Sequence, residues 1–280
     1  MENSVLSMLA IRIGLMGAGH MATALARGLV QAELVPASAI AASDPSDEAR
    51  QAFAREVSGA QVAADNVANV VQADVVLLAV KPQQIGEALA ALRGALRADA
   101  LIVSIAAGVT LNRIADALPA GQRIVRVMPN TPCLIGQGAS GFSLGEHATT
   151  ADGQLVAKLL SAVGAAFEVP EELLDAVTGL SGSGPAFVYS MIEALTEGGT
   201  AAGLPAKLAA ELAARTAAGA AEMVLQTGET PAVLREQVTS PGGTTVAGLA
   251  VLTERGFKDA VVGAVQAAAR RSAELGRVSK

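Results

Sequence analysis

Ala10-Ile-Arg-Ile-Gly-Leu-Met-Gly-Ala-Gly-His-Met-Ala22 begins as a short apolar segment, passes through a glycine turn and enters a helix-forming sequence. Gly17, Gly19 and Ala22 occupy the three small positions of the dinucleotide-binding fingerprint. The first lets the chain turn sharply, the second lets the backbone approach a pyrophosphate, and the third lets the helix pack closely on the strand. An ordinary strand-to-helix turn is the alternative. The apolar residues before the turn and the helix-forming residues after it favour a nucleotide site, with phosphates at the helix N-terminus.

The composition of the 280 residues is typical of a protein with a sizeable aliphatic core. Hydrophobic residues make up 51% of the chain but aromatic residues 2%, which suits parallel strands covered by closely packed helices. The net charge of -6 does not indicate the basic surface that binds nucleic acid. The single cysteine, Cys133, excludes a disulfide framework and a cysteine zinc site, and is typical of a reducing compartment.

The N-terminal residues lack the pattern of a secretory signal. Glu2 stands where a basic flank is expected, and Arg12 interrupts the apolar run. No uncharged apolar run is long enough to span a bilayer. The sequence therefore predicts a soluble cytoplasmic protein that acts without a membrane or a nucleic acid.

Apolar runs alternate with helical patterns over residues 1–170. After the first strand and helix, the expected strands are 40–43, 74–80, 100–105, 123–127, 139–144 and 166–169, and the expected helices are 48–57, 84–96, 111–118 and 151–163. This alternation predicts an α/β Rossmann-type domain, in which a parallel sheet carries helices on both faces. Ligands of such sheets bind beyond the carboxyl ends of the strands, so the residues that follow each strand are expected to face one crevice.

Residues 171–280 have a different pattern, in which long Ala- and Leu-rich helical segments replace the strands. The expected helices cover residues 186–196, 206–226, 245–255 and 258–275. Apolar residues in the second of them recur at helical spacing, for example Leu208 and Leu212. Such helices carry more apolar surface than a thin layer buries, so we expect an all-α oligomerisation domain shared between subunits. The two domains are expected to join tightly near Pro170.

Several residues that follow the predicted strands are candidates for cofactor contacts. Asp44 stands where the fingerprint expects an acid that accepts the 2′-hydroxyl of NAD and repels the 2′-phosphate of NADP. Ser43 is instead able to donate to a phosphate, and Asp44 is equally suited to opening the turn before Pro45, so cofactor preference stays open. Lys81 suits either a cofactor contact or a solvated loop. Two further such segments are Ala106-Ala-Gly108 and Asn130-Thr131.

Two glycine loops in the helical half each lead into a helix. The first is Gly179-Leu-Ser-Gly-Ser-Gly-Pro185, and the second is Thr239-Ser-Pro-Gly-Gly-Thr-Thr245. A loop of small residues at a helix N-terminus presents several N–H groups and hydroxyls, which together hold a carboxylate. Ordinary helix caps have the same composition. For residues 240–245 we favour an anion site.

The chain offers no base for alcohol oxidation. His20 lies inside the glycine turn and His147 in a polar segment. The β-hydroxyacid dehydrogenases carry a catalytic lysine four residues after a glycine loop like 179–184, and this position is Val188. Reduction of a C=N bond needs less: a hydride donor, a carboxylate clamp and one hydrogen bond to nitrogen.

The motifs resemble those of the pyrroline-5-carboxylate reductase family, from Ile11 to about Leu275. The most specific blocks are Ala176-Val-Thr-Gly-Leu-Ser-Gly-Ser-Gly-Pro-Ala186 and Ser240-Pro-Gly-Gly-Thr-Thr245, in this order and in the helical half. The others are Gly17-Ala-Gly-His-Met21, Ala79-Val-Lys-Pro82, Ala106-Ala-Gly108 and Met128-Pro-Asn-Thr-Pro132. The resemblance implies a Rossmann domain over residues 1–170 and a helical domain over 171–280. The latter would form an intertwined homodimer, often assembled further into a homodecamer.

The resemblance also implies which residues meet the ligands, and it implies no metal. The cofactor, NADPH or NADH, would contact Met16, Gly17, Ala18, Gly19, His20, Met21, Ser43, Asn66, Ala79, Val80, Lys81, Pro82, Ala107 and Gly108. The substrate, 1-pyrroline-5-carboxylate, would contact Glu171, Gln237, Ser240, Gly242, Gly243, Thr244 and Thr245. The Thr245 hydroxyl corresponds to the group that hydrogen-bonds the ring nitrogen. Gln237 departs from relatives that carry Asn, although its longer amide should still reach.

The implied reaction is hydride transfer from the reduced nicotinamide to the C=N carbon of the substrate, which gives L-proline. The alternatives are a related cyclic-imine or keto-acid reductase and a non-catalytic nucleotide-binding sensor. Glycine loops in both halves argue against the sensor, which needs the first alone. Family members commonly favour NADPH, but Asp44 leaves the preference open. The sequence does not decide between dimer and decamer or reveal feedback regulation by proline.

Overall fold

The computed structural model describes residues 8–65, 67 and 70–278. Contacts within the chain divide it into two units. Residues 1–182 together with 268–280 form the first, which we call the Rossmann unit, and residues 183–267 form the second, the helical unit.

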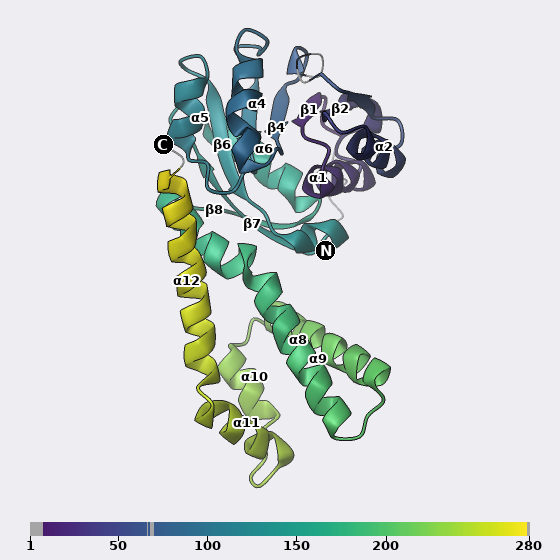
Figure 1. Ribbon diagram of the computed structural model, residues 1–280, viewed down its shortest axis with the longest axis vertical. Helices are drawn as coiled ribbons and strands as arrows, with labels where there is room; N and C mark the ends of the chain where they lie inside the picture. The colour runs from purple at the N-terminus through teal and green to yellow at the C-terminus, as the bar shows by residue number, and fades with distance from the viewer. Residues whose placement is uncertain (1–7, 66, 68–69, 279–280) are drawn as a thin grey trace. The chain divides into compact units, whose positions relative to one another are not determined.

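The Rossmann unit is built on an eight-stranded sheet of order β3-β2-β1-β4-β5-β6-β7-β8 (Figure 1). The strands are β1 (Ile13–Met16), β2 (Ile40–Ser43), β3 (Gln61–Ala63), β4 (Val75–Leu78), β5 (Leu101–Ser104), β6 (Arg123–Met128), β7 (Gly138–Leu144) and β8 (Gly164–Glu168). Strands β1 to β6 run parallel, which confirms the predicted α/β fold. β3 is an additional strand of three residues, too short to leave a periodic signal. The strand order reverses between β1 and β4, where sheets of this kind bind their ligands.

Side chains alternate between the two faces of the sheet, and helices cover both. Ile13 and Leu15 of β1 belong to a core that includes residues of α1 (His20–Gln31), α2 (Asp47–Glu56) and α6 (Thr150–Ser161). Met16 of β1 belongs to the core of the other face, which includes residues of α4 (Ile85–Leu92) and α5 (Leu111–Ala117). A strand whose side chains all enter a core is uniformly apolar, which is why the sequence signal for these strands is strong.

β7 departs from the predicted parallel arrangement. It pairs antiparallel with β6, with Val127 opposite Phe142, and β8 then pairs parallel with β7. The connection from β6 to β7 holds a 3-10 turn, η3 (Thr131–Ile135), and no crossover helix. A parallel return needs a crossover of roughly a dozen or more residues, so the short connection forces the antiparallel course. The end of β7 consequently lies away from the predicted crevice.

The segment that follows the sheet is helical where the sequence predicts a glycine loop. After β8 come η4 (Glu171–Leu173), α7 (Leu174–Val177) and a π-helical turn, η5 (Thr178–Gly182), so the expectation of a loop over residues 179–182 is wrong. The Thr178 and Ser181 hydroxyls donate to the carbonyl oxygens of Leu174 and Val177, at 2.7 and 3.0 Å. These bonds to carbonyls four residues earlier help hold the turn. π-Helical turns are frequent at functional sites.

The helical unit contains α8 (Gly184–Ala201), α9 (Ala206–Thr227), α10 (Pro231–Gln237), α11 (Thr244–Glu254) and the first half of α12 (Phe257–Val278). α8 and α9 pack closely, because a Cβ built on Gly199 would lie 3.3 Å from the Ala209 Cβ. Ala209 and Ala213 are the buried residues of this unit, whereas Leu208 and Leu212 are 45% and 47% exposed. α10 is an additional helix of one and a half to two turns, begun by the Thr230 cap.

The last part of α12 belongs to the Rossmann unit. Ser272 is buried there, and its Oγ donates to Asp175 Oδ1 of α7 at 2.6 Å. Gly276 lies against the turn that follows β5, since a Cβ on Gly276 would lie 3.5 Å from the Gly108 carbonyl oxygen. The last part of α12 thus packs beside a segment that the sequence resemblance assigns to cofactor binding. The remaining short elements of this unit are η1 (Ala37–Ala39) and η2 (Pro82–Gln84).

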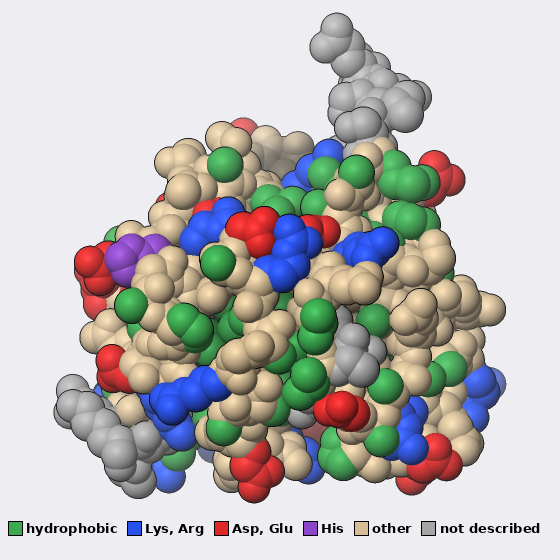
Figure 2. Space-filling view, turned by 90° about the horizontal axis from the view of Figure 1, so that it is seen from above, with side chains coloured by type: hydrophobic (Ala, Val, Ile, Leu, Met, Phe, Trp, Pro, Cys, Tyr) green, Lys and Arg blue, Asp and Glu red, His purple; other side chains and the backbone are tan. Residues whose placement is uncertain are grey.

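The face of the molecule seen in Figure 2 mixes side chains of both charges. Arg97 illustrates such pairing, because it contacts Asp74 at 2.8 Å and Asp99 at 2.7 Å. The hydrogen bond from Arg97 lowers the pKa of the Asp99 carboxyl. None of the described helices has the length and hydrophobicity to cross a bilayer.

Candidate active site

Four strands of the Rossmann unit end at one edge and bring the predicted cofactor segments together. Backbone pairing continues past the strand ends: the Gly17 N–H donates to the Ser43 carbonyl at 2.7 Å, and the Ala79 N–H donates to the Met16 carbonyl at 2.8 Å. The Ile105 N–H donates to the Leu78 carbonyl at 3.0 Å. The glycine turn therefore lies between the segment after β2 and the segment after β4, and the segment after β5 follows.

Gly17 and Gly19 satisfy different requirements of the turn. Gly17 has φ +102°, and a Cβ there would lie 2.7 Å from the Ala79 carbonyl oxygen, so any other residue would strain the backbone. Gly19 has an ordinary φ of -74°, and a Cβ on it would meet no described atom within 4 Å. The backbone is thus open in front of Gly19, as the close approach of a pyrophosphate requires. The turn fits a dinucleotide.

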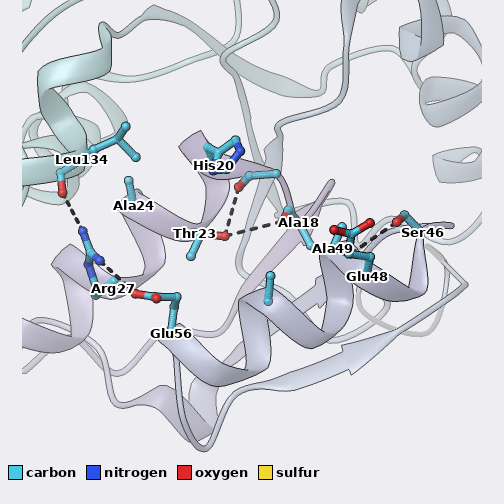
Figure 3. Close-up of a pocket in the computed structure, with 12 residues that line it drawn as sticks. Ala18, His20, Thr23, Ala24, Arg27, Ser46, Glu48, Ala49, Glu56 and Leu134 are labelled. Atoms are coloured by element: carbon cyan, nitrogen blue, oxygen red, sulfur yellow. Dashed lines mark hydrogen bonds and ion pairs between the residues drawn. The ribbon is translucent and has the colours of Figure 1, made fainter.

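A pocket of about 480 Å³ opens at this turn and extends between α1 and α2 (Figure 3). Ala18, Gly19 and His20 line the end at the glycine turn, and Arg27 pairs with Glu56 at 2.9 Å further along. α1 has no side-chain cap among the described residues, so the N–H groups of its first turn remain available to a phosphate.

The Asp44 carboxylate faces the glycine turn. Its Oδ2 accepts from the Ala18 N–H at 3.0 Å, and its Oδ1 accepts from the Ser46 N–H at 2.9 Å. The bond to Ser46 is the turn-opening contact that the sequence allows, and the bond to Ala18 places the same carboxylate at the fingerprint. The turn-opening role is therefore observed, and the contact of Asp44 with the ribose stays a prediction.

Ser43 lies in a different environment from Asp44. It is fully buried, and its Oγ donates to the Leu15 carbonyl at 3.2 Å, across to the neighbouring strand. The structure thus uses this hydroxyl within the sheet, and its contact with the cofactor stays a prediction.

The other predicted cofactor residues divide into buried and accessible ones. Met16 and Ala18 are buried, Met21, Ala79, Val80, Pro82 and Gly108 are partly buried, and His20, Lys81 and Ala107 are exposed. Gly108 has φ +72°, so it is a position that favours glycine. Asn66 lies outside the described residues.

Glu171 has two partners inside the Rossmann unit. Its Oε1 accepts from Arg126 Nη1 at 2.9 Å and from the Leu111 N–H at 2.8 Å, at the first residue of α5. The Arg126 side chain is 8% exposed, so Glu171 neutralises a buried cation on β6. The sequence interpretation missed Arg126. The signal that could have identified it is the presence of a charged residue within an otherwise apolar strand. The predicted contact of Glu171 with the substrate stays a prediction.

Asn130 connects three segments near the end of β6. Its Oδ1 accepts from the Ala139 N–H at 2.9 Å, and its Nδ2 donates to the Ser181 carbonyl at 3.1 Å. The side chain is buried, so both halves of the amide are satisfied without solvent. The segment 128–132 is therefore tied to β7 and to the π-helical turn.

The predicted substrate loop lies in the helical unit, at the start of α11. Gly242 has φ +69°, and the Gly243 N–H donates to the Ser240 carbonyl at 2.9 Å. A Cβ on Gly243 would lie 2.5 Å from the Ser240 Oγ and 3.0 Å from the Ser240 carbonyl oxygen, so the turn is closely packed. α11 begins with Thr244 and Thr245, and no side chain of the described residues caps it. Within the described residues the Thr245 hydroxyl makes no hydrogen bond, so it remains available to a ligand.

Gln237 and the two histidines complete the predicted set. Gln237 is the last residue of α10, is exposed and lies three positions before Ser240. His20 begins α1, and His147 is exposed after β7. The described residues contain no cluster of three or more His, Cys, Asp or Glu side chains suited to a metal.

Two family models match the chain. The model described as pyrroline-5-carboxylate reductase dimerisation matches residues 171–275, and the model described as NADP oxidoreductase, coenzyme F420-dependent, matches residues 12–108. The first begins at the predicted domain boundary, whereas contacts divide the units after Gly182.

Curated proteins and a solved structure match nearly the whole chain. The pyrroline-5-carboxylate reductase of Methanosarcina acetivorans is 44% identical over 269 residues, which cover 95% of this chain and 98% of that protein. That of Arabidopsis thaliana is 45% identical over 266 residues, covering 94% and 95%. The structure of Plasmodium falciparum pyrroline carboxylate reductase with NADP bound has a TM-score of 0.86 and 31% identity, covering 96% of this chain and all of that one.

Proposed function

The chain belongs to the pyrroline-5-carboxylate reductase family, and from this premise we propose that it reduces 1-pyrroline-5-carboxylate to L-proline with NADPH or NADH. One observation carries the proposal: the chain combines a glycine turn that is open to a pyrophosphate with an uncapped helix start bearing Thr244 and Thr245. A nucleotide-binding sensor would need the first feature alone. The solved relative with NADP bound supports NADPH as the cofactor.

The Rossmann unit is proposed to bind the cofactor. Gly17 to Met21 would hold the pyrophosphate against the start of α1, because Gly19 leaves the backbone open there. The segments Ala79–Pro82 and Ala107–Gly108 would line the path of the cofactor along the same edge of the sheet. Ser43 and Asn66 belong to the same proposed set.

The helical unit is proposed to hold the substrate carboxylate. The free N–H groups at the start of α11 present partial positive charge, and Gly242 and Gly243 let the loop turn closely around Ser240. The Thr244 amide would be a donor. The Gly243 N–H, which donates to the Ser240 carbonyl at 2.9 Å, would have to give up this bond to become a second donor. Gln237 and Glu171 would lie at the edge of the substrate.

Thr245 is proposed as the catalytic residue. When bound, the reduced nicotinamide supplies the hydride that adds to the C=N carbon. The nitrogen gains one proton in the same conversion, so the product is the secondary amine of proline. The Thr245 hydroxyl would donate to this nitrogen and orient the C=N bond.

The oligomer and the location are also proposals. The exposed apolar residues of α9, such as Leu208 and Leu212, support a homodimer that shares the helical units, with a decamer as a further assembly. We place the protein in the cytoplasm, in keeping with its single cysteine.

The test is loss of nicotinamide absorbance when the purified protein meets 1-pyrroline-5-carboxylate, with NADPH and NADH in parallel. We expect rapid loss and stoichiometric proline. A six-membered cyclic imine and a keto acid serve as matched substrates, and faster turnover of either would replace the proposed substrate. Cofactor binding without turnover of any of them would favour the sensor.

A further inference from the structure

We propose, building on the proposed function, that Asp44 is a specificity-determining residue that disfavours a 2′-phosphate on the adenosine ribose and so shifts the chain toward NADH. The residue follows β2 directly, the position at which dinucleotide-binding sheets meet the ribose 2′ substituent. A carboxylate there accepts hydrogen bonds from a ribose diol and repels a phosphate. NADPH would still bind, with lower affinity than the same site would give without the carboxylate.

Two backbone hydrogen bonds hold the Asp44 carboxylate at the glycine turn. Oδ2 accepts from the Ala18 N–H at 3.0 Å, and Oδ1 accepts from the Ser46 N–H at 2.9 Å. Figure 3 shows Ala18 at the glycine turn before α1 and Ser46 at the start of α2, on the same pocket. A rotation of the side chain away from the ribose would break both bonds. The negative charge therefore stays where the 2′ substituent arrives.

The neighbouring charges do not offset this carboxylate. Asp47 and Glu48 occupy the first turn of α2. The cation of the same segment, Arg50, donates through Nη1 to the Asp44 carbonyl at 2.7 Å and the Pro45 carbonyl at 3.0 Å, and through Nη2 to Asp47 Oδ1 at 3.0 Å. NADP-binding sites use a nearby arginine for the phosphate, and here the guanidinium holds the turn instead.

The experiment measures the dissociation constants of NADPH and NADH by calorimetry without substrate, for the wild type, Asp44→Ser and Asp44→Asn. We expect both substitutions to tighten NADPH binding relative to NADH by about tenfold, or about 1.4 kcal/mol. The ratio of the two dissociation constants is informative even if the substitution loosens the turn, because a looser turn would weaken the binding of both cofactors. Melting temperatures confirm that each variant is folded.

Asp47→Asn is the matched control, because it removes the same charge three positions further along the chain, in the first turn of α2. The Asp47 oxygens face Arg50 and Gln51 rather than the glycine turn. We expect a much smaller change in the ratio. Added salt should also raise the relative affinity for NADPH in the wild type and in Asp47→Asn, but less in Asp44→Ser, because salt screens the repulsion.

Two outcomes would overturn the proposal. One is an unchanged ratio in both Asp44 variants, and the other is an equal change in Asp47→Asn. A selective loss of NADPH binding in Arg50→Gln would show that the Arg50 guanidinium binds the 2′-phosphate. This result would contradict the role of Arg50 in holding the turn. Absence of proline formation in every variant would refute the proposed function, while the binding ratio would still decide the role of Asp44.

Discussion

The glycine turn before α1 and the glycine turn before α11 use similar residues in opposite settings. At the first, Gly17 is fixed by the Ser43 and Ala79 backbones and the Asp44 carboxylate holds the adjacent Ala18, all within the Rossmann unit. At the second, contacts come from the loop itself, chiefly between Gly243 and Ser240, and the surrounding residues are exposed or partly exposed. The first turn is thus complete within one unit of one chain. For the second turn, we propose that the ligand and other protein surface complete the site.

The largest expected effect is at the second turn. Thr245→Ala should lower the turnover number by about 100-fold or more, the contribution typical of a positioned proton donor. The dissociation constant of the cofactor should stay unchanged, because the glycine turn before α1 is untouched. Stopped-flow turnover and cofactor titration measure the two quantities.

Thr244→Ala is the matched control for Thr245→Ala. It shortens the neighbouring residue of α11 but keeps the backbone N–H that is proposed to bind the carboxylate. Equal losses of turnover in the two variants would remove the special role of the Thr245 hydroxyl.

Substitution of Gly17 is expected to disrupt the first turn, because the backbone conformation there requires glycine. Gly17→Ala should lower the free energy of unfolding by about 2 to 4 kcal/mol, since its φ is positive and its Cβ meets the Ala79 carbonyl. Gly19→Ala should leave the melting temperature unchanged and weaken cofactor binding by about tenfold or more, or about 1.4 kcal/mol. Thermal denaturation without cofactor, followed by titration, separates the two effects. A stable Gly17→Ala variant would contradict the account of this turn.

Glu171 tests whether a residue assigned to the substrate acts within the Rossmann unit. Glu171→Ala leaves the buried Arg126 guanidinium and the Leu111 N–H without this partner, which should cost about 2 to 4 kcal/mol of stability. Glu171→Gln keeps an oxygen for the Leu111 N–H and should cost less. If Glu171→Ala melts like the wild type but has a raised substrate KM, the residue belongs to the substrate site instead.

The smallest expected effect concerns Cys133, a buried thiol of the Rossmann unit. Burial raises the pKa of this thiol, so the folded protein keeps it protonated to higher pH than the unfolded chain does. This contribution to stability is complete below the unfolded pKa and is lost as the pH rises through the folded value. We expect a slight loss of stability above about pH 8.5 that is absent in Cys133→Ala. Denaturation at pH 7 and pH 10 measures it, and identical losses in both proteins would exclude the thiol as the cause.

The elements predicted from sequence were those with a long and uniform pattern. The parallel strands other than β3 agree with their apolar runs, and the helices α9 and α12 agree with their helical periodicity. The glycines of the first turn also lie where the fingerprint predicts the turn. β3 and α10 were missed because three and seven residues carry little periodic signal. The loop expected over residues 179–182 proved π-helical, since glycines and serines are also compatible with a wide helical turn supported by side-chain bonds.

Sequence alone determined the fold class, the glycine turn and the family, because these depend on spacing along the chain. Tertiary structure decided the antiparallel course of β7, the pairing of Glu171 with Arg126 across 45 positions, and the orientation of Asp44 toward Ala18 across 26. These features depend on which strand ends lie next to one another and on which residues form ion pairs or hydrogen bonds with the charged side chains. Both are set by the packing of segments that lie far apart in the chain, so no local pattern records them.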